Sequence, residues 1–397
     1  MQAAAEPWTL QAAFELSEGA NDNVFLTPGG TTPTDLNGDT ILDDPKERFD
    51  LITTLSGIFT LSRKHALGSF SASYQPGIDL YARYHDLNSP FHIGAVNFST
   101  VGLGSGLLEQ AKLELSDYAA LTKQQKVFLQ ADLPVAGIDT GRSDAFRNSA
   151  AGILTVPFTD SFSAHIGYSH NLTFYEDSTL LDSVEHIVTL GGTDKLTERT
   201  SIDIVYSYHR FDFDGGIFEV NRSQPESHVL TAELASTITP TLDARVKGGA
   251  SYRSDRNLTD FVGGVSLSKR FERTSVTARY ARETVAYGGG FFSQPLAGQL
   301  FGIDIDHILG EHATARLVGE YRDLRANFSA QPGVTRSFSI EASAGYAMTR
   351  RMKIRAVYRH FAQRLFDNTP TTATNVPEFR NNTLVLTLTS TWGGPTL

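Results

Sequence analysis

The stretch that decides the fold is Gly68-Ser-Phe-Ser-Ala-Ser-Tyr-Gln-Pro-Gly-Ile-Asp-Leu-Tyr-Ala-Arg-Tyr84. Its even-numbered positions are mostly apolar, as at Phe70, Ile78 and Leu80, and its odd-numbered positions are mostly polar. A period of two residues is that of a β-strand with one apolar and one polar face. The stretch is much longer than a strand of a soluble protein, whose usual length is about 5–6 residues. It therefore favours a β-fold built from long strands.

The same alternation recurs along the chain, clearly so over 242–253 and 337–348. It predicts strands near 8–17, 48–62, 66–84, 94–102, 110–120, 145–157, 162–174, 183–194, 199–213, 227–239, 241–254, 257–270, 273–287, 299–309, 311–326, 335–349, 351–365 and 379–392. An even number of strands closes an antiparallel barrel. Because 94–102 and 110–120 alternate most weakly, 16 strands stay open as an alternative. We expect an all-β protein, a closed antiparallel transmembrane β-barrel of 18 strands, as a single domain over residues 1–397.

The connections between these segments alternate in length. Short turns occur at Thr239-Pro240 and at Arg350-Arg351, among others. Long connections cover 18–47, 121–144, 214–226, 288–298 and 366–378. Outer-membrane barrels combine short periplasmic turns with long outer loops. We therefore expect the first strand to run outward, both termini to be periplasmic and loop 18–47 to be extracellular.

Composition excludes several classes of protein. The 397 residues include no cysteine, which excludes a disulfide scaffold, a cysteine-ligated zinc site and a thiol enzyme. No segment offers the roughly 20 consecutive apolar residues of a membrane-spanning helix. With 34 Lys and Arg against 44 Asp and Glu, the net charge of −10 argues against a nucleic-acid partner. The segment Met1–Trp8 has no charged or apolar region of a signal peptide, so we expect that peptide to have been removed.

Aromatic residues near the ends of the apolar rows favour lipid outside the barrel. They are Trp8, Tyr84, Tyr208, Tyr252, Tyr280, Tyr321, Tyr346, Tyr358 and Trp392. Such positions suit aromatic girdles at two membrane interfaces; the alternative is scattered strand aromatics, since Tyr and Phe favour sheets. The last apolar row ends on Trp392 and is similar to the terminal signal of barrel assembly, although Gly393–Leu397 follows it. We therefore expect a bacterial outer-membrane protein whose partners are outer-membrane lipid and the barrel-assembly machinery.

Two segments carry a family resemblance. Asn21-Asp-Asn-Val-Phe-Leu-Thr-Pro28, followed by Phe49-Asp-Leu-Ile-Thr-Thr-Leu-Ser-Gly-Ile58, resembles the opening of a family of Gram-negative outer-membrane β-barrel porins. These porins are often encoded beside exopolysaccharide synthesis and export genes. Ala72–Tyr81 is similar to that family's second repeat of the motif, whereas the first repeat here lacks the usual proline between its serine and glycine. The resemblance covers residues 1–85 and implies an export or diffusion pore, with periplasmic polysaccharide-export components as partners.

The polar rows should line a lumen, because barrels of 16–18 strands leave an aqueous channel. In the C-terminal half their charges alternate in sign between neighbouring strands. The expected pore-lining residues are Glu233, Arg245, Lys247, Arg279, Asp304, Asp306, Arg316, Glu320, Glu341, Lys353, Arg355 and Arg359. Opposite charges on adjacent strands stabilise pairing by roughly 0.2–1 kcal/mol. The ladder therefore predicts a stiffened wall, a charged constriction that selects solutes, or both. The N-terminal polar rows are more neutral, with Ser69, Ser71, Ser73, Gln75, Ser163, Ser169 and Asn171.

Loop 18–47 contains the segment Asp35-Leu-Asn-Gly-Asp-Thr-Ile-Leu-Asp-Asp44. Its oxygen spacing matches that by which a short loop wraps Ca²⁺, and it is similar to the calcium loops of dockerin and thrombospondin-like repeats. The expected ligands are the side chains of Asp35, Asn37, Asp39 and Asp43 and the backbone carbonyl of Ile41. An acidic surface turn rich in Asp, Asn and Gly is the alternative. Structural calcium is the one cofactor that we expect.

We expect no enzyme, because the histidines are scattered. Ser163 and His165 share an inward row, as any polar pair of a lumen would. The expected function is an outer-membrane conduit that exports an extracellular polysaccharide through an aqueous lumen. One alternative is a general or solute-selective diffusion porin, and another is a plugged barrel that acts as a structural or adhesive surface protein.

Overall fold

The computed structural model describes residues 7–23, 49–123, 144–176, 181–215, 224–254, 257–285, 296–327, 332–367 and 379–393. The strands are β1 (Thr9–Asn21), β2 (Asp50–His65), β3 (Gly68–Tyr81), β4 (Ser89–Val101), β5 (Lys112–Lys123), β6 (Asp144–Pro157), β7 (Phe162–Tyr175), β8 (Leu181–Thr197), β9 (Thr200–Gly215), β10 (Glu226–Thr239), β11 (Leu242–Arg253), β12 (Leu258–Arg270), β13 (Thr274–Val285), β14 (Leu296–Ile308), β15 (Ala313–Asn327), β16 (Pro332–Ala347), β17 (Met352–Asp367) and β18 (Phe379–Trp392). Two short 3-10 helices, η2 (His85–Leu87) and η3 (Gly106–Glu109), lie in the connections described. In these parts of the chain, no helix is long and apolar enough to span a membrane.

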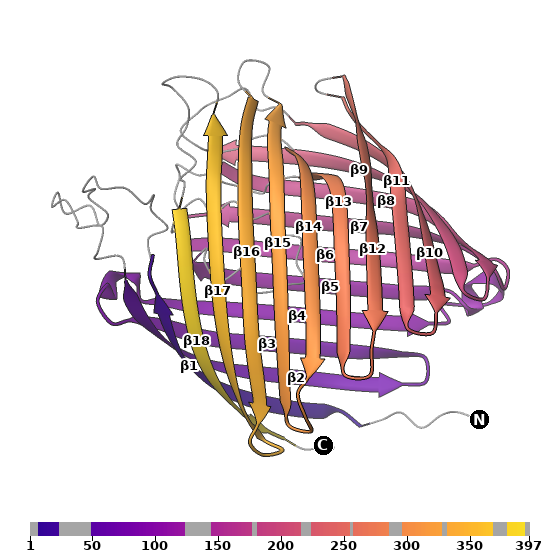
Figure 1. The fold of residues 1–397 in the computed structure, drawn as a ribbon. Helices are drawn as coiled ribbons and strands as arrows, with labels where there is room; N and C mark the ends of the chain where they lie inside the picture. Colours follow the sequence, from indigo (N-terminus) through magenta and orange to yellow (C-terminus); the bar gives the residue numbers. More distant parts are fainter. Residues whose placement is uncertain are drawn as a thin grey trace.

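All 18 strands form one closed sheet. Each strand pairs antiparallel with its neighbours in the sequence, and β1 also pairs with β18, which closes the barrel (Figure 1). The predicted 18-stranded antiparallel barrel is confirmed. The 16-stranded alternative is wrong, since both weakly alternating segments form strands, namely β4 and β5.

Several predicted strand ends differ from the structure by a few residues, and two of these differences are explained by particular residues. Strand β3 stops at Tyr81 instead of Tyr84, because the buried carboxylate of Asp50 accepts the backbone N–H groups of Arg83 and Tyr84 and turns the chain there. Strand β4 begins at Ser89, five residues before the predicted start. The alternating pattern does not indicate this beginning because Pro90 interrupts it, although a proline is tolerated near a strand end.

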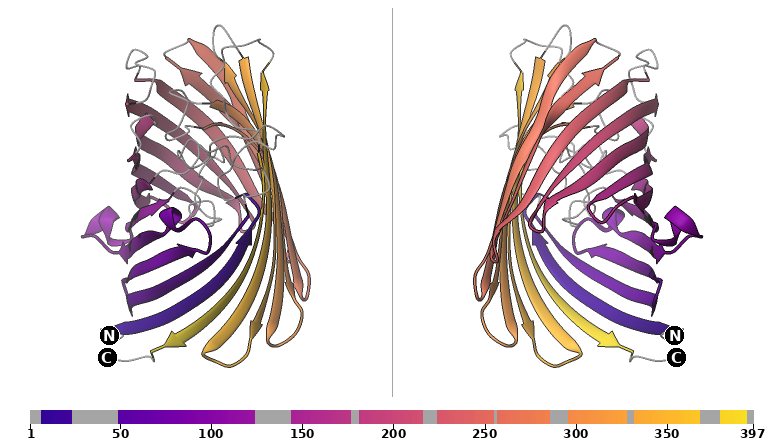
Figure 2. Two further views of the ribbon diagram at one scale, coloured as in Figure 1. Left: turned by 90° about the vertical axis from the view of Figure 1, so that its left-hand side faces the viewer. Right: turned by 90° about the vertical axis from the view of Figure 1, so that its right-hand side faces the viewer.

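The strands alternate in direction, so their connections fall into two sets at opposite ends of the barrel. The described turns at 66–67, 158–161, 198–199 and 240–241 share one end, where β1 also begins and β18 ends (Figure 2). The connection between β1 and β2 lies at the other end, but only residues 22, 23 and 49 of it are described. Strand β1 continues to Asn21, past the predicted start of the loop at 18, and most of the predicted loop lies outside the described residues.

The outer face shows where the membrane boundary lies. Tyr280, Phe301, Tyr321 and Phe338 occupy one cross-strand row on β13 to β16. Ring centroids in this row are 4.8 Å apart for Tyr280 and Phe301 and 6.3 Å apart for Phe301 and Tyr321. The next row toward the long-loop end is polar and consists of Arg282, Gln299, Asp323 and Arg336. An aromatic row directly below a charged row is typical of a girdle at a membrane interface.

The seam between β1 and β18 has its own polar contacts. The hydroxyls of Ser17 and Thr387 are 2.9 Å apart across it. At the long-loop end, the buried Asn381 donates its amide to the side-chain oxygen of Asn21 at 3.1 Å and to the carbonyl of Asn23 at 3.0 Å. Asn382 donates to Asp22 in the same way. Residues 21–23, which begin the segment that resembles the porin family, thus join the first strand of the sheet to the last.

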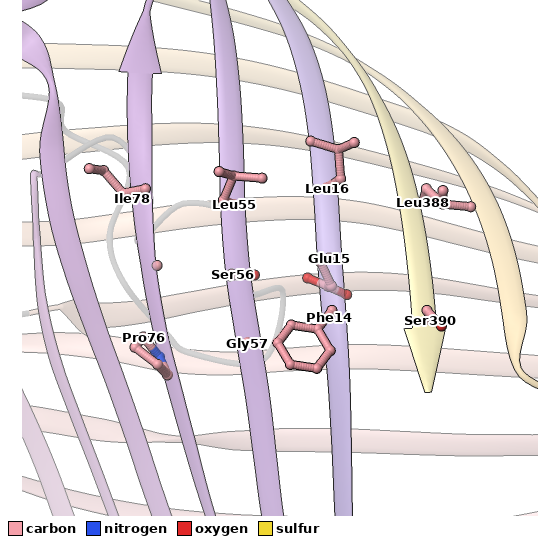
Figure 3. Close-up of a pocket in the computed structure, with 11 residues that line it drawn as sticks. Phe14, Glu15, Leu16, Leu55, Ser56, Gly57, Pro76, Ile78, Leu388 and Ser390 are labelled. Atoms are coloured by element: carbon pink, nitrogen blue, oxygen red, sulfur yellow. The ribbon is translucent and has the colours of Figure 1, made fainter. Parts of the chain in front are cut away.

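A hollow of about 610 Å³ lies over β18, β1, β2 and β3 (Figure 3). Phe14, Leu16, Leu55 and Ile78 stand around it, and Gly57 leaves the space because it has no side chain. The strand register puts Phe14 opposite Gly57 and Leu16 opposite Leu55, on the apolar outer face. The hollow therefore belongs to the lipid-facing surface and is separate from any path through the barrel.

Candidate solute pathway on the inner face

The strand register places the predicted pore-lining residues on the inner, polar face of β10, β11 and β13 to β17. Residues that pair directly across antiparallel strands share a face of the sheet. Most of the predicted charges form ion pairs on the inner faces of β13 to β17, which we call the charged wall. The pairs fall into three groups along this wall.

The first group joins β13 to β15. The Arg279 guanidinium forms an ion pair with one oxygen of Glu320, and Arg322 donates to the other oxygen at 2.8 Å. Arg279 reaches past the intervening strand β14 because Gly302 lies between them: a Cβ added there would lie 2.6 Å from Nε of Arg279. The Glu320 side chain is only 17% exposed, so the carboxylate is well enclosed by its two partners.

The second group centres on Arg316. Its guanidinium donates to Asp304 through Nε at 3.1 Å and through Nη2 at 2.5 Å. Asp306 lies opposite Arg316 in the register, with its carboxylate 3.6 Å from Nε. Two hydrogen bonds from one guanidinium to one carboxylate fix the side-chain geometry better than a single contact.

The third group joins β16 and β17. Glu341 accepts from Arg359 at 2.6 Å and from Arg355 at 3.4 Å, and Arg355 also donates to the hydroxyl of Ser343 at 3.2 Å. Lys353 lies on the same face, opposite Ala347 and Thr389.

The predicted residues of β10 and β11 are less closely joined. Glu233 lies directly opposite Lys247 in the register, and its nearest ion pair is with Arg245 at 3.8 Å. The Arg245 side chain is 68% exposed. These three residues are therefore brought to one face but do not form a compact network.

The wall formed by β6 to β9 carries a different set of contacts, and we call it the amide wall. Ser149 donates to Asn171 at 2.7 Å, and Asn171 donates to Glu185 at 3.1 Å. The other oxygen of Glu185 lies 3.0 Å from Nδ1 of His209. Asn171 is among the inner-face residues predicted from the sequence, whereas Glu185 and His209 are not. Their positions in the alternating rows of β8 and β9 could have revealed both.

Several inner-face charges are open to water. The side chains of Asp306 and Arg355 are 58% and 51% exposed, and that of Arg279 is 48% exposed. A barrel filled by its own side chains at this level would bury them. The inner face can therefore contact hydrated solutes along the charged wall.

The predicted calcium ligands, Asp35 to Asp43, lie outside the described residues, so the calcium site stays a prediction. In the part of the chain that the structure describes, no group of three or more His, Asp or Glu residues could hold a metal ion. Ser163 and His165 do share the inner face, opposite Pro157 and Thr155.

Comparison with known proteins identifies the class of fold. No family model matches the chain, and no curated protein is similar to it. Among solved structures, Pseudomonas aeruginosa OccK2 (OpdF) is 11% identical, covers 97% of this chain and 98% of its own length, and has a TM-score of 0.50. Pseudomonas aeruginosa OprD is 9% identical over 98% of this chain and 97% of its own, with a TM-score of 0.47. At this level of identity the likeness to OccK2 shows the fold, a closed 18-stranded antiparallel β-barrel.

This likeness corrects the expected function. The export of an extracellular polysaccharide, which rested on the resemblance of residues 1–85, is wrong, because the OccK2 neighbour belongs to the diffusion porins. The diffusion-porin alternative is the one that the fold favours. The porin part of the resemblance agrees with the observed 18-stranded barrel, whereas its association with polysaccharide export has no support.

Proposed function

We propose that this protein is a passive diffusion pore of the outer membrane, selective for small hydrophilic solutes. The observation that carries the proposal is the exposure of the charged wall inside a closed barrel: Arg279, Asp306 and Arg355 are about half exposed although they point away from lipid. Water that reaches these side chains can also carry solutes past them. Fixed charges of both signs then discriminate among solutes by their charge. The protein breaks no bond in this role.

Single-channel recording in planar bilayers tests the proposal. We expect the purified protein to insert and to give discrete, steady conductance steps. Heat-unfolded protein is the control for leakage caused by detergent. If folded barrels insert without any steady current, the lumen is blocked, and the structural or adhesive alternative replaces the diffusion pore. Swelling of liposomes that contain the protein in sugar or amino-acid solutions then ranks uncharged and charged solutes.

Two further expectations belong to this proposal. The chain reaches the outer membrane after a signal peptide is removed, which N-terminal sequencing of protein from outer membranes tests. The barrel-assembly machinery inserts it into lipid through the strand that ends on Trp392. Trp392→Ala is expected to lower the amount of folded protein in the outer membrane while leaving its synthesis unchanged.

Loop calcium is a separate part of the proposal. We expect Ca²⁺ to protect the segment Asp35–Asp43 from protease, because several oxygens would be fixed around one ion. Asp39→Asn should remove this protection, and Thr32→Ala, in the same loop but outside the motif, should keep it. Equal cleavage of the unsubstituted protein with calcium and with chelator contradicts the site.

A further inference from the structure

One carboxylate lies where the outer face should be most apolar. Asp117 is near the middle of β5, with Leu115 and Ala119 on either side of it on the same face. In the register it is opposite Val96 on β4 and Ala150 on β6, both of which belong to the outer face. Other outer-face carboxylates of the described strands lie near strand ends, as Glu18 and Asp194 do. An ionisable group at mid-height in contact with lipid is costly and marks a functional site.

The contacts of Asp117 within its own barrel are incomplete. Asn148 donates its amide to Oδ1 of Asp117 at 2.7 Å, and the same nitrogen donates to the carbonyl of Tyr118 at 3.0 Å. Among the described residues, no donor reaches the second oxygen, Oδ2. Because the side chain of Asp117 is exposed, this oxygen faces the lipid or protein that surrounds the barrel. Hydrocarbon offers no hydrogen-bond donor to it.

Complementary donors lie on the same face, a short distance around the barrel. Ala150 is followed in the same cross-strand row by His170 on β7 and then by His186 on β8. The two imidazole rings are 4.9 Å apart. Around Asp117 the outer face is flat, because Gly94, Ala119, Ala150 and Gly152 carry small side chains or none. The face thus combines an acceptor, two groups with N–H donors and a flat surface that a second backbone can approach.

We propose that the outer face of β4 to β8 is an interface with a second copy of this chain. Copies in one membrane share their orientation, so a two-fold axis along the membrane normal brings the same patch of both barrels together. Asp117 of one barrel then faces the histidine side of the other, and both acceptors leave the lipid. The interface goes beyond the diffusion pore, since each barrel keeps its own lumen.

The chain offers a clean cross-linking test because it has no cysteine. Ala150→Cys places one thiol in the proposed interface. Ala232→Cys on β10 is the matched control. Both alanines face outward and are the seventh residue of a 14-residue strand, and the two strands run in the same direction. A short bismaleimide applied to intact outer membranes should give covalent dimers of the Ala150→Cys protein and none of the Ala232→Cys protein.

Asp117→Leu, combined with Ala150→Cys, tests the carboxylate itself. Leucine suits lipid, so the barrel should fold, which its heat-modifiable migration in gels checks. The cross-linked fraction should fall by roughly tenfold, the equivalent of about 1.4 kcal/mol of association free energy. Glu18→Leu, which removes an outer-face carboxylate of β1, outside the proposed interface, should leave cross-linking unchanged. Single-channel conductance of the Asp117→Leu protein should equal that of the unsubstituted protein, which separates this inference from the proposed pore.

The contrary results are equally distinct. Cross-linking at Ala150→Cys that does not exceed the level at Ala232→Cys would show that lipid alone covers the face, and would overturn the proposal. Undiminished cross-linking in the presence of Asp117→Leu would overturn the role of the carboxylate.

Discussion

The charged wall and the amide wall are built on the same alternating strands, yet they hold their side chains in different ways. On the charged wall, one guanidinium spans an intervening strand, from Arg279 on β13 to Glu320 on β15. On the amide wall, Ser149, Asn171 and Glu185 connect each strand only to the next one. Long basic side chains can therefore link strands that do not touch, provided that a small residue such as Gly302 leaves room.

The two walls also differ in the role that we expect of them. Amides and hydroxyls on the amide wall satisfy one another, and their net contribution is about 0.5–1.5 kcal/mol for each hydrogen bond. The charged wall keeps exposed charges of both signs, and their fields reach into the lumen over about 8–10 Å at moderate salt. We therefore expect the charged wall to decide which ions pass, and the amide wall to contribute mainly to stability.

Among the substitutions that test the difference between the two walls, Glu320→Gln should have the largest effect on stability. The substitution leaves the guanidiniums of Arg279 and Arg322 near each other without their carboxylate, and charged hydrogen bonds contribute about 1.5–3 kcal/mol each. We expect a loss of about 2 kcal/mol in the free energy of unfolding, measured by urea titration in detergent micelles. Glu233→Gln is the control, because its 3.8 Å pair with the exposed Arg245 should contribute about 0–1 kcal/mol. Equal losses for both variants would show that the enclosed carboxylate of Glu320 stabilises the barrel no more than the carboxylate of Glu233.

Gly302→Ala should have the next largest effect. The added methyl group would meet the Arg279 side chain, with Nε only 2.6 Å away, so the guanidinium must leave Glu320 or shift. Since that side chain is flexible, we expect a loss of about 1 kcal/mol, close to one hydrogen bond. Gly248→Ala is a matched control on β11, because nothing lies within 4 Å of its new methyl group. A Gly302→Ala barrel as stable as the control would show that Arg279 does not need the gap.

Arg355→Glu tests the electrical role of the charged wall. A unit charge acts on an ion at 4 Å in water with about 1 kcal/mol, so reversing one charge should change the permeability ratio of cations to anions severalfold toward cations. The reversal potential across a salt gradient measures this ratio. The change should shrink in 1 M salt, where the screening length is about 3 Å. An unchanged reversal potential at low salt would leave this wall only a structural role.

Ser149→Ala should have the smallest effect. It removes one hydrogen bond to Asn171 on the amide wall, and we expect a loss of about 1 kcal/mol in unfolding free energy. Ion selectivity should stay unchanged, because no charge is altered. A clear shift of the reversal potential in this variant would contradict the division of tasks between the two walls.

The sequence predicts the fold well because a period of two survives in every strand. All 18 predicted segments correspond to strands, including β4 and β5, where the pattern is weakest. One error arises because a side chain bonds to a distant part of the backbone. Asp50 ends β3 early through bonds to Arg83 and Tyr84, and no local pattern around Tyr84 reveals this. Tyr84 therefore lies in the connection before η2 and not in a strand.

The inner-face residues could be predicted as a set, but their pairing could not. Alternation assigns Arg279, Gly302 and Glu320 to the same face, whereas the contact across β14 depends on the register of three strands at once. Alternation also puts Glu185 on the inner face, but nothing in the serine-rich rows around it indicates that it joins Asn171 to His209. Asp117 is a different case, since the alternation itself puts a charge on the lipid side, and the pattern alone gives no reason for it.

The seam between β1 and β18 has a consequence for biogenesis. Ser17 and Thr387 meet across it although 370 positions separate them in the chain. The first strand to leave the ribosome must therefore wait for the last one, and until then both terminal strands expose unpaired backbone that attracts other chains. Such late closure makes maturation slow and dependent on chaperones. Weakening the asparagine contacts at the rim should delay completion of the barrel without altering what the finished barrel transports.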